Sequence, residues 1–175
     1  MGGLAATGFG GEGEPVYDFD ADPAQPKPAF YRELVAAADA LTAGEPDGIA
    51  NMANLAALVW QLVPELNWAG FYRRIGSELV LGPFCGRPAC IRIPLGRGVC
   101  GTAAASAESQ LVADVYAYPG HIACAAASRS ELVVPVVRDG AVIAVIDLDS
   151  PRPARFDAED QAGLEALARL AAGRI

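Results

Sequence analysis

The hydrophobic positions in the first third of the chain recur every three or four residues, which predicts two amphipathic helices. The first helix is expected to end at Gly44. The second is expected to begin near Asp47 and to end at Pro64. Neither carries recognisable chemistry, so both are interpreted as core elements. Their apolar positions are Phe30, Leu34, Ala38 and Leu41 in the first helix, and Ile49, Met52, Ala56, Val59 and Val63 in the second.

After Pro64 the pattern changes to short β-type runs separated by turn residues, and Asp139-Gly140 is a strong hairpin signal. Asp157 is predicted to cap a C-terminal helix with acidic residues in its first turn. Most of the predicted strands are joined by hairpins, and strands and helices do not alternate as in βαβ units. This order predicts an antiparallel sheet with helices layered on it. The predicted strands are 67–74, 78–84, 91–93, 110–112, 131–137 and 141–149, with a small-residue helix over 101–106.

Composition adds a domain boundary to this pattern. The chain has 175 residues, of which 53% are hydrophobic, enough for one domain with its own core. Residues 1–27 are rich in Gly, Pro, Ala and acidic residues and show no apolar periodicity. We therefore expect a flexible N-terminal tail over 1–27 and a folded domain over 28–175.

Charge narrows the classes of partner. The formal net charge is −8, from 21 acidic and 13 basic residues, and no basic stripe is present, so nucleic acid is not expected as a partner. An acidic surface also disfavours anionic membranes. The N-terminus has neither the basic nor the apolar region of a secretory signal, and no apolar run is long enough to span a bilayer. We expect a cytoplasmic protein whose cysteines stay reduced unless redox chemistry uses them.

All four cysteines and the single histidine fall between residues 82 and 124. A buried, inert thiol is one interpretation, and it suits Cys85 best because nothing polar in the sequence converges on it. A zinc site is a second, but the spacings contain no CxxC pair, so we expect no metal and no cofactor. The third is a reactive thiol with a second thiol that captures its sulfenic acid as a disulfide.

Two cysteines have a context that favours thiolate. Cys100 follows a glycine-rich turn containing Arg97 and precedes the predicted helix start at Gly101, so a cation and free N–H groups are expected near it. Cys124 has His121 three residues before it, although that histidine is as well explained by a structural role. Cys90 and Cys124 are far apart in sequence, and only the fold decides whether they meet.

Three acidic residues lie in otherwise apolar runs. They are Glu131, Asp147 and Asp149, and the last two are two positions apart on one predicted strand, hence on one face. Like charges together in an apolar setting are costly unless a cation binds there or one acid stays protonated. Asp149 alone could cap the following turn, but that interpretation does not explain Asp147.

These residues together resemble the GAF-domain free methionine-(R)-sulfoxide reductases. The resemblance covers the chain from about Phe30 onward, and the pair GRGVCGTA and GHIAC is its most specific part. It implies an α/β (α+β) fold of the GAF type, with an antiparallel sheet and helices packed on it. The matching segments are NWAGFY (67–72), LVLGPF (79–84), AC (89–90), RIPLGRGVCGTA (92–103), GHIACAAASRSELVVP (120–135) and VIDLDS (145–150).

The resemblance also implies an activity and a role for each residue. The activity is that of an oxidoreductase that reduces the R epimer of free methionine sulfoxide, as a homodimer recycled by a thioredoxin-like reductant. Cys124 is similar to the family's nucleophile, Cys90 to its resolving thiol, and Cys100 to a third cysteine of the disulfide relay. Two rival classes remain, a GAF small-molecule sensor and a thiol-based redox sensor without catalysis. The implied substrate-binding residues are Trp68 and Tyr72 for the methyl-sulfur end, and Glu131, Asp147 and Asp149 for the ammonium and the sulfoxide oxygen.

Overall fold

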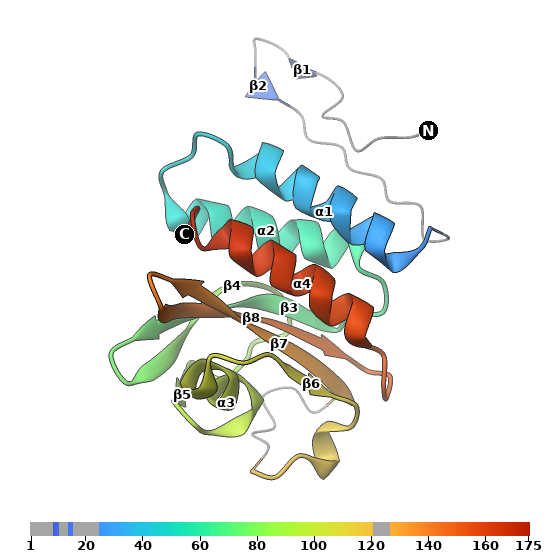
Figure 1. Ribbon diagram of the computed structural model, residues 1–175, viewed down its shortest axis with the longest axis vertical. Helices are drawn as coiled ribbons and strands as arrows, with labels where there is room; N and C mark the ends of the chain where they lie inside the picture. The colour runs from blue at the N-terminus through green and yellow to red at the C-terminus, as the bar shows by residue number, and fades with distance from the viewer. Residues whose placement is uncertain (1–8, 11–13, 16–24, 121–126) are drawn as a thin grey trace.

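The core of the protein is a six-stranded antiparallel sheet, seen in a computed structural model that describes residues 9–10, 14–15, 25–120 and 127–175 (Figure 1). The strand order is β5-β4-β3-β8-β7-β6, and every neighbouring pair is antiparallel. The predicted antiparallel architecture is therefore confirmed. The strands are β3 (Trp68–Ile75), β4 (Glu78–Gly86), β5 (Arg92–Pro94), β6 (Gln110–Val112), β7 (Ser130–Arg138) and β8 (Ala141–Ser150).

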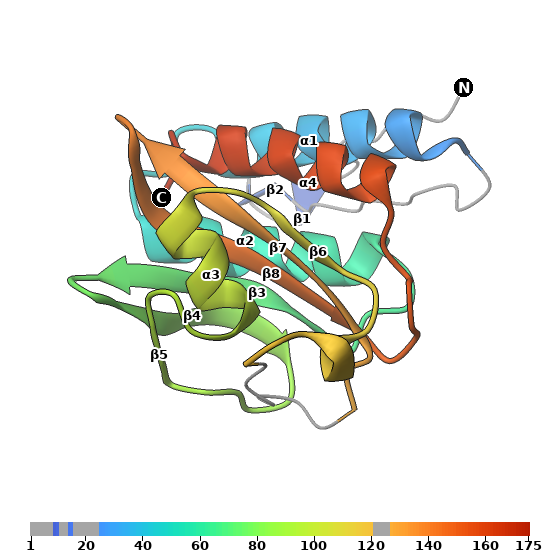
Figure 2. The same cartoon turned by 60° about the horizontal axis from the view of Figure 1, so that its bottom comes forward.

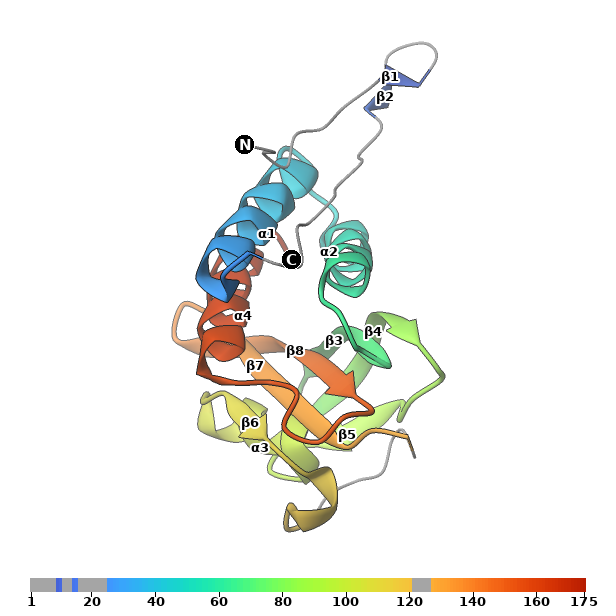
Figure 3. The ribbon, with the colours of Figure 1, turned by 90° about the vertical axis from the view of Figure 1, so that its right-hand side faces the viewer.

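Two helices cover one face of this sheet, and a third packs outside them. Helix α2 (Gly48–Leu62) packs on β3 and β4, and α4 (Ala158–Ala171) packs on β7. Helix α1 (Lys27–Thr42) lies on α2 and α4 rather than on the strands, so it forms an outer layer (Figures 1 and 3). The large apolar core lies between these helices and the sheet.

The opposite face is covered differently. Helix α3 (Gly98–Ser106) and the β5 segment lie on the side of the sheet away from α1 and α4, as Figure 2 shows. A second, smaller apolar cluster fills this side. Alternation along β3 separates the two environments, because Ala69 and Phe71 face the large core while Trp68 and Tyr72 face the smaller cluster. The sheet thus separates the large apolar core from the smaller apolar cluster.

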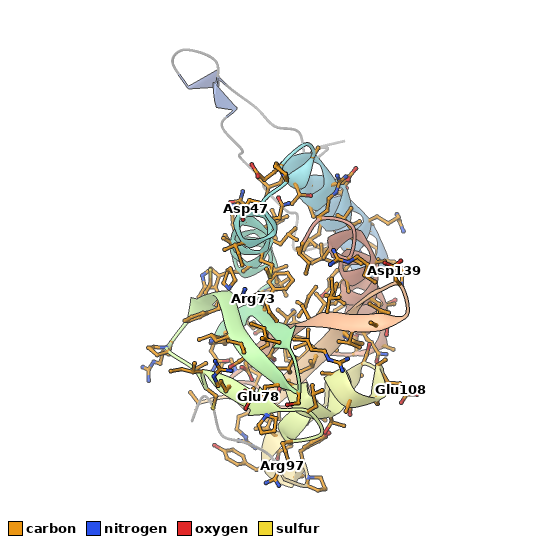
Figure 4. The ribbon with its side chains drawn as sticks, turned by 90° about the vertical axis from the view of Figure 1, so that its left-hand side faces the viewer. Asp47, Arg73, Glu78, Arg97, Glu108 and Asp139 are labelled. Atoms are coloured by element: carbon orange, nitrogen blue, oxygen red, sulfur yellow. The ribbon has the colours of Figure 1, made fainter. Side chains whose placement is uncertain are left out.

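Side-chain caps and a tight turn fix the ends of several elements. The Asp47 side chain accepts hydrogen bonds from the Ile49 and Ala50 amides at 2.8 and 2.9 Å, an N-cap that contributes about 1 kcal/mol. Asp157 caps α4 in the same way within a full capping box. Asp139 and Gly140, both at positive φ, form the β7–β8 turn. Asp47 and Asp139 are labelled at these positions in Figure 4.

Some boundaries differ from the prediction. Helix α3 begins at Gly98 rather than Gly101, so Cys100 lies inside its first turn instead of before it. Ile49, predicted on the buried face of α2, is 46% exposed. A short antiparallel pair, β1 (Phe9–Gly10) with β2 (Glu14–Pro15), was not expected in the N-terminal segment. None of the helices in the described ranges is long and apolar enough to cross a bilayer.

A buried acidic residue joins α1 to α4. Asp160 is 1% exposed, and both of its oxygens have partners. One accepts from the Tyr31 hydroxyl at 2.9 Å. The other accepts from Lys27 at 2.6 Å, from Arg155 at 3.2 Å and from the Asp157 amide at 2.9 Å. Two cations and a hydroxyl therefore compensate this carboxylate completely.

Candidate active site

The three predicted acids lie on the face of the sheet away from α1, α2 and α4, in two rows that cross three neighbouring strands. In the first row, Asp149 on β8 is directly opposite Trp68 on β3 and Glu131 on β7. In the second row, Asp147 lies between Gly70 and Val133. Paired Cβ atoms in antiparallel strands are about 4.5–5.5 Å apart, so the register alone places these acids within reach of one another. The sequence-based prediction that Asp147 and Asp149 share a face is confirmed.

Helix α3 adds a thiol to this acidic group. Its first turn carries Cys100, which is 4% exposed. The helix can approach the preceding turn because Gly101 has no side chain, since a Cβ there would clash with the Pro94 carbonyl oxygen. Cys100 Sγ donates to Glu131 Oε1 at 3.9 Å, a long contact even for sulfur.

Cys100, Glu131 and Asp147 form a compact donor set. One ligand atom from each lies within 4.8 Å of the other two, and all three residues are buried. Oδ1 of Asp147 is buried and has no hydrogen-bond partner. Within the described ranges, no lysine or arginine forms an ion pair with any of the three acids. The arrangement therefore holds acceptor capacity that the protein itself does not use.

Burial dominates the electrostatics of this group. It raises the pKa of Glu131 and of Asp147 well above the ordinary carboxyl range, and repulsion from the neighbouring acids adds to the effect. Burial also raises the pKa of Asp149 to about 7. At neutral pH the group therefore holds protons, and a cation entering it would displace them. It can serve both as a proton donor and as a binding site for positive charge.

The prediction that the surroundings of Cys100 favour a thiolate is wrong. Burial raises the pKa of the Cys100 thiol well above its ordinary value, and the carboxylates of Asp147 and Glu131 reinforce that shift. Arg97, the cation expected near the thiol, is exposed at the N-cap of α3. Sequence proximity suggested a cation, but the fold places acids from β7 and β8 beside the sulfur instead.

Aromatic rings form a wall next to the acids. Trp68 stacks on Tyr72 and on Phe84, with ring centroids 5.8 and 5.3 Å apart. Gly70 makes room for this stack, because a Cβ there would clash with Phe84 and lie 2.8 Å from the indole ring of Trp68. The resemblance, rather than the sequence pattern, singled out Trp68 and Tyr72 for the site, since both also read as core residues.

Both aromatic residues also hold the segment that carries Cys90. The indole N–H of Trp68 donates to the Arg87 carbonyl at 3.2 Å, and the Tyr72 hydroxyl donates to the Cys90 carbonyl at 3.0 Å. Sequence reasoning missed these bonds. The available signal was the polar atom on each ring, which needs a partner when the ring is buried.

The three cysteines within the described residues differ in their redox state. Cys90 is disulfide-bonded, whereas Cys85 and Cys100 are free. Cys85 is partly buried at the end of β4, and burial raises the pKa of its thiol, in keeping with the interpretation as an inert residue. Cys124 and His121 lie outside the described residues, so their predicted roles are not tested by this geometry.

Comparison with known proteins identifies the family. The GAF domain family matches residues 50–175. The free methionine-R-sulfoxide reductase of Escherichia coli is 49% identical over 141 residues, which are 81% of this chain and 86% of that protein. The yeast protein of the same name, from Saccharomyces cerevisiae, is 43% identical over 152 residues, 82% and 84% of the two chains. The chain belongs to the GAF-domain family of free methionine-R-sulfoxide reductases.

A solved structure of this reductase family extends the match to three dimensions. The free methionine-R-sulfoxide reductase of Neisseria meningitidis, determined in complex with its substrate, superposes with a TM-score of 0.83 at 46% identity. The match covers 86% of this chain and 91% of that one.

Proposed function

We propose that this chain reduces free L-methionine-(R)-sulfoxide to methionine by thiol chemistry. The observation that carries the proposal is the placement of two buried acids, Glu131 and Asp147, and the half-buried Asp149 beside an aromatic wall on one face of the sheet. A free amino acid brings its own ammonium group, which the acids can bind. The methyl-sulfur end suits contact with Trp68 and Tyr72.

The proposed reaction needs two thiols and one proton donor. The thiolate of Cys124 attacks the sulfoxide sulfur while a protonated acid of the group donates its proton to the sulfoxide oxygen. The raised carboxyl pKa values support this step, because they keep a proton available near neutral pH. The protonated oxygen then passes from the methionine sulfur to the Cys124 sulfur as the bond between the two sulfur atoms breaks, so that methionine leaves and Cys124 becomes a sulfenic acid.

The cycle closes through a second thiol. Cys90 attacks the sulfenic acid, forms a disulfide and releases water, so that one sulfoxide and two thiols yield one sulfide, one disulfide and water. A thioredoxin-like dithiol then reduces that disulfide. The disulfide-bonded state of Cys90 supports its participation. Cys100 is proposed as an auxiliary member of the relay. The homodimer and the cytoplasmic location remain predictions, the first of which light scattering would test.

Chiral analysis of racemic free methionine sulfoxide after incubation with dithiothreitol tests the proposal. We expect loss of the R epimer only, and slow turnover of sulfoxide within peptides, because a peptide-linked residue lacks the ammonium. Cys124→Ser should abolish even a single turnover, whereas Cys90→Ser should retain one turnover and lose recycling. Cys85→Ser is the matched control and should keep nearly full activity.

The rival sensor function makes a different prediction in the same assay. A GAF sensor would bind a nucleotide, or oxidise its cysteines, without consuming sulfoxide. Equal consumption of both epimers, or full turnover by the Cys124→Ser variant, would contradict the reductase proposal.

A further inference from the structure

The same site contains a set of donors that suits a metal ion as well as an ammonium ion. Its three members come from three elements, namely Cys100 on α3, Glu131 on β7 and Asp147 on β8. An ammonium group needs only hydrogen-bond acceptors, and carboxylates alone would supply them. A sulfur atom among the acceptors adds affinity for thiophilic cations.

We propose that Cys100, Glu131 and Asp147 bind a thiophilic divalent cation of the Zn²⁺ class, and that this cation inhibits the enzyme. The inhibition rests on the proposed function, because the cation would occupy the place of the substrate's ammonium. The binding itself does not depend on that function.

The distances fit a small tetrahedral ion. Zinc binds thiolate sulfur at about 2.3 Å and carboxylate oxygen at about 2.0 Å, which places the two donors about 3.5 Å apart in a tetrahedron. Cys100 Sγ and Glu131 Oε1 are 3.9 Å apart, and all three donor atoms lie within 4.8 Å of one another. The Cys100–Glu131 separation exceeds the ideal value by about 0.4 Å and the other donor pairs exceed theirs by at most about 1.5 Å, so modest side-chain movements would complete the geometry.

The unpartnered oxygen of Asp147 points independently to a bound cation. The residue is 6% exposed, and its Oδ1 atom has no hydrogen-bond partner. An unsatisfied buried polar atom is destabilising, and a coordinated ion would relieve that cost. Asp160, which is also buried, differs because Lys27 and Arg155 both donate hydrogen bonds to it.

The donor set also selects among cations. Three protein ligands leave one tetrahedral position for water, as in an open zinc site. Calcium requires six to eight oxygen ligands, and magnesium disfavours sulfur, so neither should compete at similar concentration. The ligands must lose their protons to bind metal, so affinity should fall as pH falls.

Cobalt(II) is the probe that tests this proposal, because a thiolate-bound cobalt ion has a near-ultraviolet charge-transfer absorption. The protein to use is the full-length chain with Cys85, Cys90 and Cys124 all replaced by Ser, so that Cys100 is its single thiol. We expect one equivalent of cobalt(II) to give this absorption, and one equivalent of Zn²⁺ to remove it. Adding Cys100→Ser should abolish the band.

Carboxylate variants of the same single-thiol protein identify the other ligands. Asp147→Asn and Glu131→Gln should each weaken the affinity by about tenfold or more, whereas Asp139→Asn, in the exposed β7–β8 turn, should leave it unchanged. Thermal melting of each variant confirms that it is folded. Absence of the band, its persistence without Cys100, or unchanged affinity in both carboxylate variants would overturn the proposal.

Inhibition is measured separately from binding. With the natural cysteines restored, Zn²⁺ should inhibit turnover competitively with free methionine sulfoxide, and substrate should displace cobalt from the single-thiol protein. A positive cobalt result without reductase activity would leave the metal site standing and refute the proposed function. Reductase activity without a cobalt band would support the proposed function and refute the metal site.

Discussion

Asp160 and Asp147 are both buried aspartates, on opposite sides of the same sheet, and they differ in what surrounds them. Asp160 has two cations, a hydroxyl and an amide as partners. Asp147 has no cation within the described residues, and one of its oxygens is unpartnered. The first carboxylate stabilises the joint between α1 and α4. The second destabilises the protein unless it is protonated or bound to a ligand. Burial alone therefore does not distinguish a structural acid from a functional one.

The largest expected effect on stability comes from replacing Asp160, whose two oxygens both have hydrogen-bond partners. Asp160→Asn leaves Lys27 and the buried guanidinium of Arg155 without their counter-charge, and we expect the free energy of unfolding to fall by about 3 kcal/mol. For a chain of this size, Tm should drop by about 6–12 °C. Thermal melting checks this, while kcat/KM below the transition should stay close to that of the parent protein. If Asp160→Asn lost activity while its Tm stayed unchanged, Asp160 would be a functional acid rather than a structural one.

The corresponding variant on the other face of the sheet, Asp147→Asn, is expected to lower activity rather than stability. Asp147→Asn removes a buried acid that no protein cation compensates, so Tm should stay constant or rise. Loss of its charge toward the substrate's ammonium should lower kcat/KM for free methionine sulfoxide by about 100-fold, the equivalent of about 2.7 kcal/mol. Steady-state kinetics and melting of this variant beside Asp160→Asn provide the test. A large drop in Tm for Asp147→Asn would show that the acid is structural.

The two regions are also expected to differ in their pH response. The folded pKa of Asp149 is raised to about 7, so the folded state holds the extra proton between about pH 4 and pH 7, and stability falls as pH rises through that range. The slope is at most about 1.4 kcal/mol per pH unit for one proton. On the other face, the hydrogen bond from Lys27 lowers the pKa of Asp157 to about 2, and this contribution is lost only as pH falls from about 4 toward 2.

Denaturant unfolding of the ligand-free protein at several pH values measures that response. Asp149→Asn should reduce the slope between about pH 4 and pH 7, with Glu131 and Asp147 contributing the remainder, and Asp157→Asn should leave it unchanged. If stability instead rises with pH across this interval in the parent protein, the assignment of a proton-holding acidic group is wrong.

Local sequence signals predicted most of the architecture. Periodicity gave α1 and α2, the caps Asp47 and Asp157 marked helix starts, and Asp139-Gly140 fixed the β7–β8 register. These features depend on neighbours within a few residues. The start of α3 was misplaced because glycines at its beginning read as a turn rather than as helix.

The sequence identified individual residues of the site, but it did not predict which of them contact one another. The two-residue spacing of Asp147 and Asp149 predicted their common face. The contact between Cys100 and Glu131, 31 positions apart, depends on how closely α3 approaches β7. That approach is a tertiary contact between α3 and β7, which no local pattern encodes. For this reason the sequence suggested a basic environment for Cys100 where the structure has an acidic one.

The stack of rings over Gly70 has a consequence for altering substrate scope. Enlarging a binding site usually means trimming a side chain, but position 70 has none to trim, and any replacement would push Trp68 and Phe84 out of place. Acceptance of bulkier sulfoxides would therefore have to start from one of those two rings. Shortening Trp68 would also release the backbone of Arg87, so wider selectivity and slower recycling through the Cys90 segment should arise together.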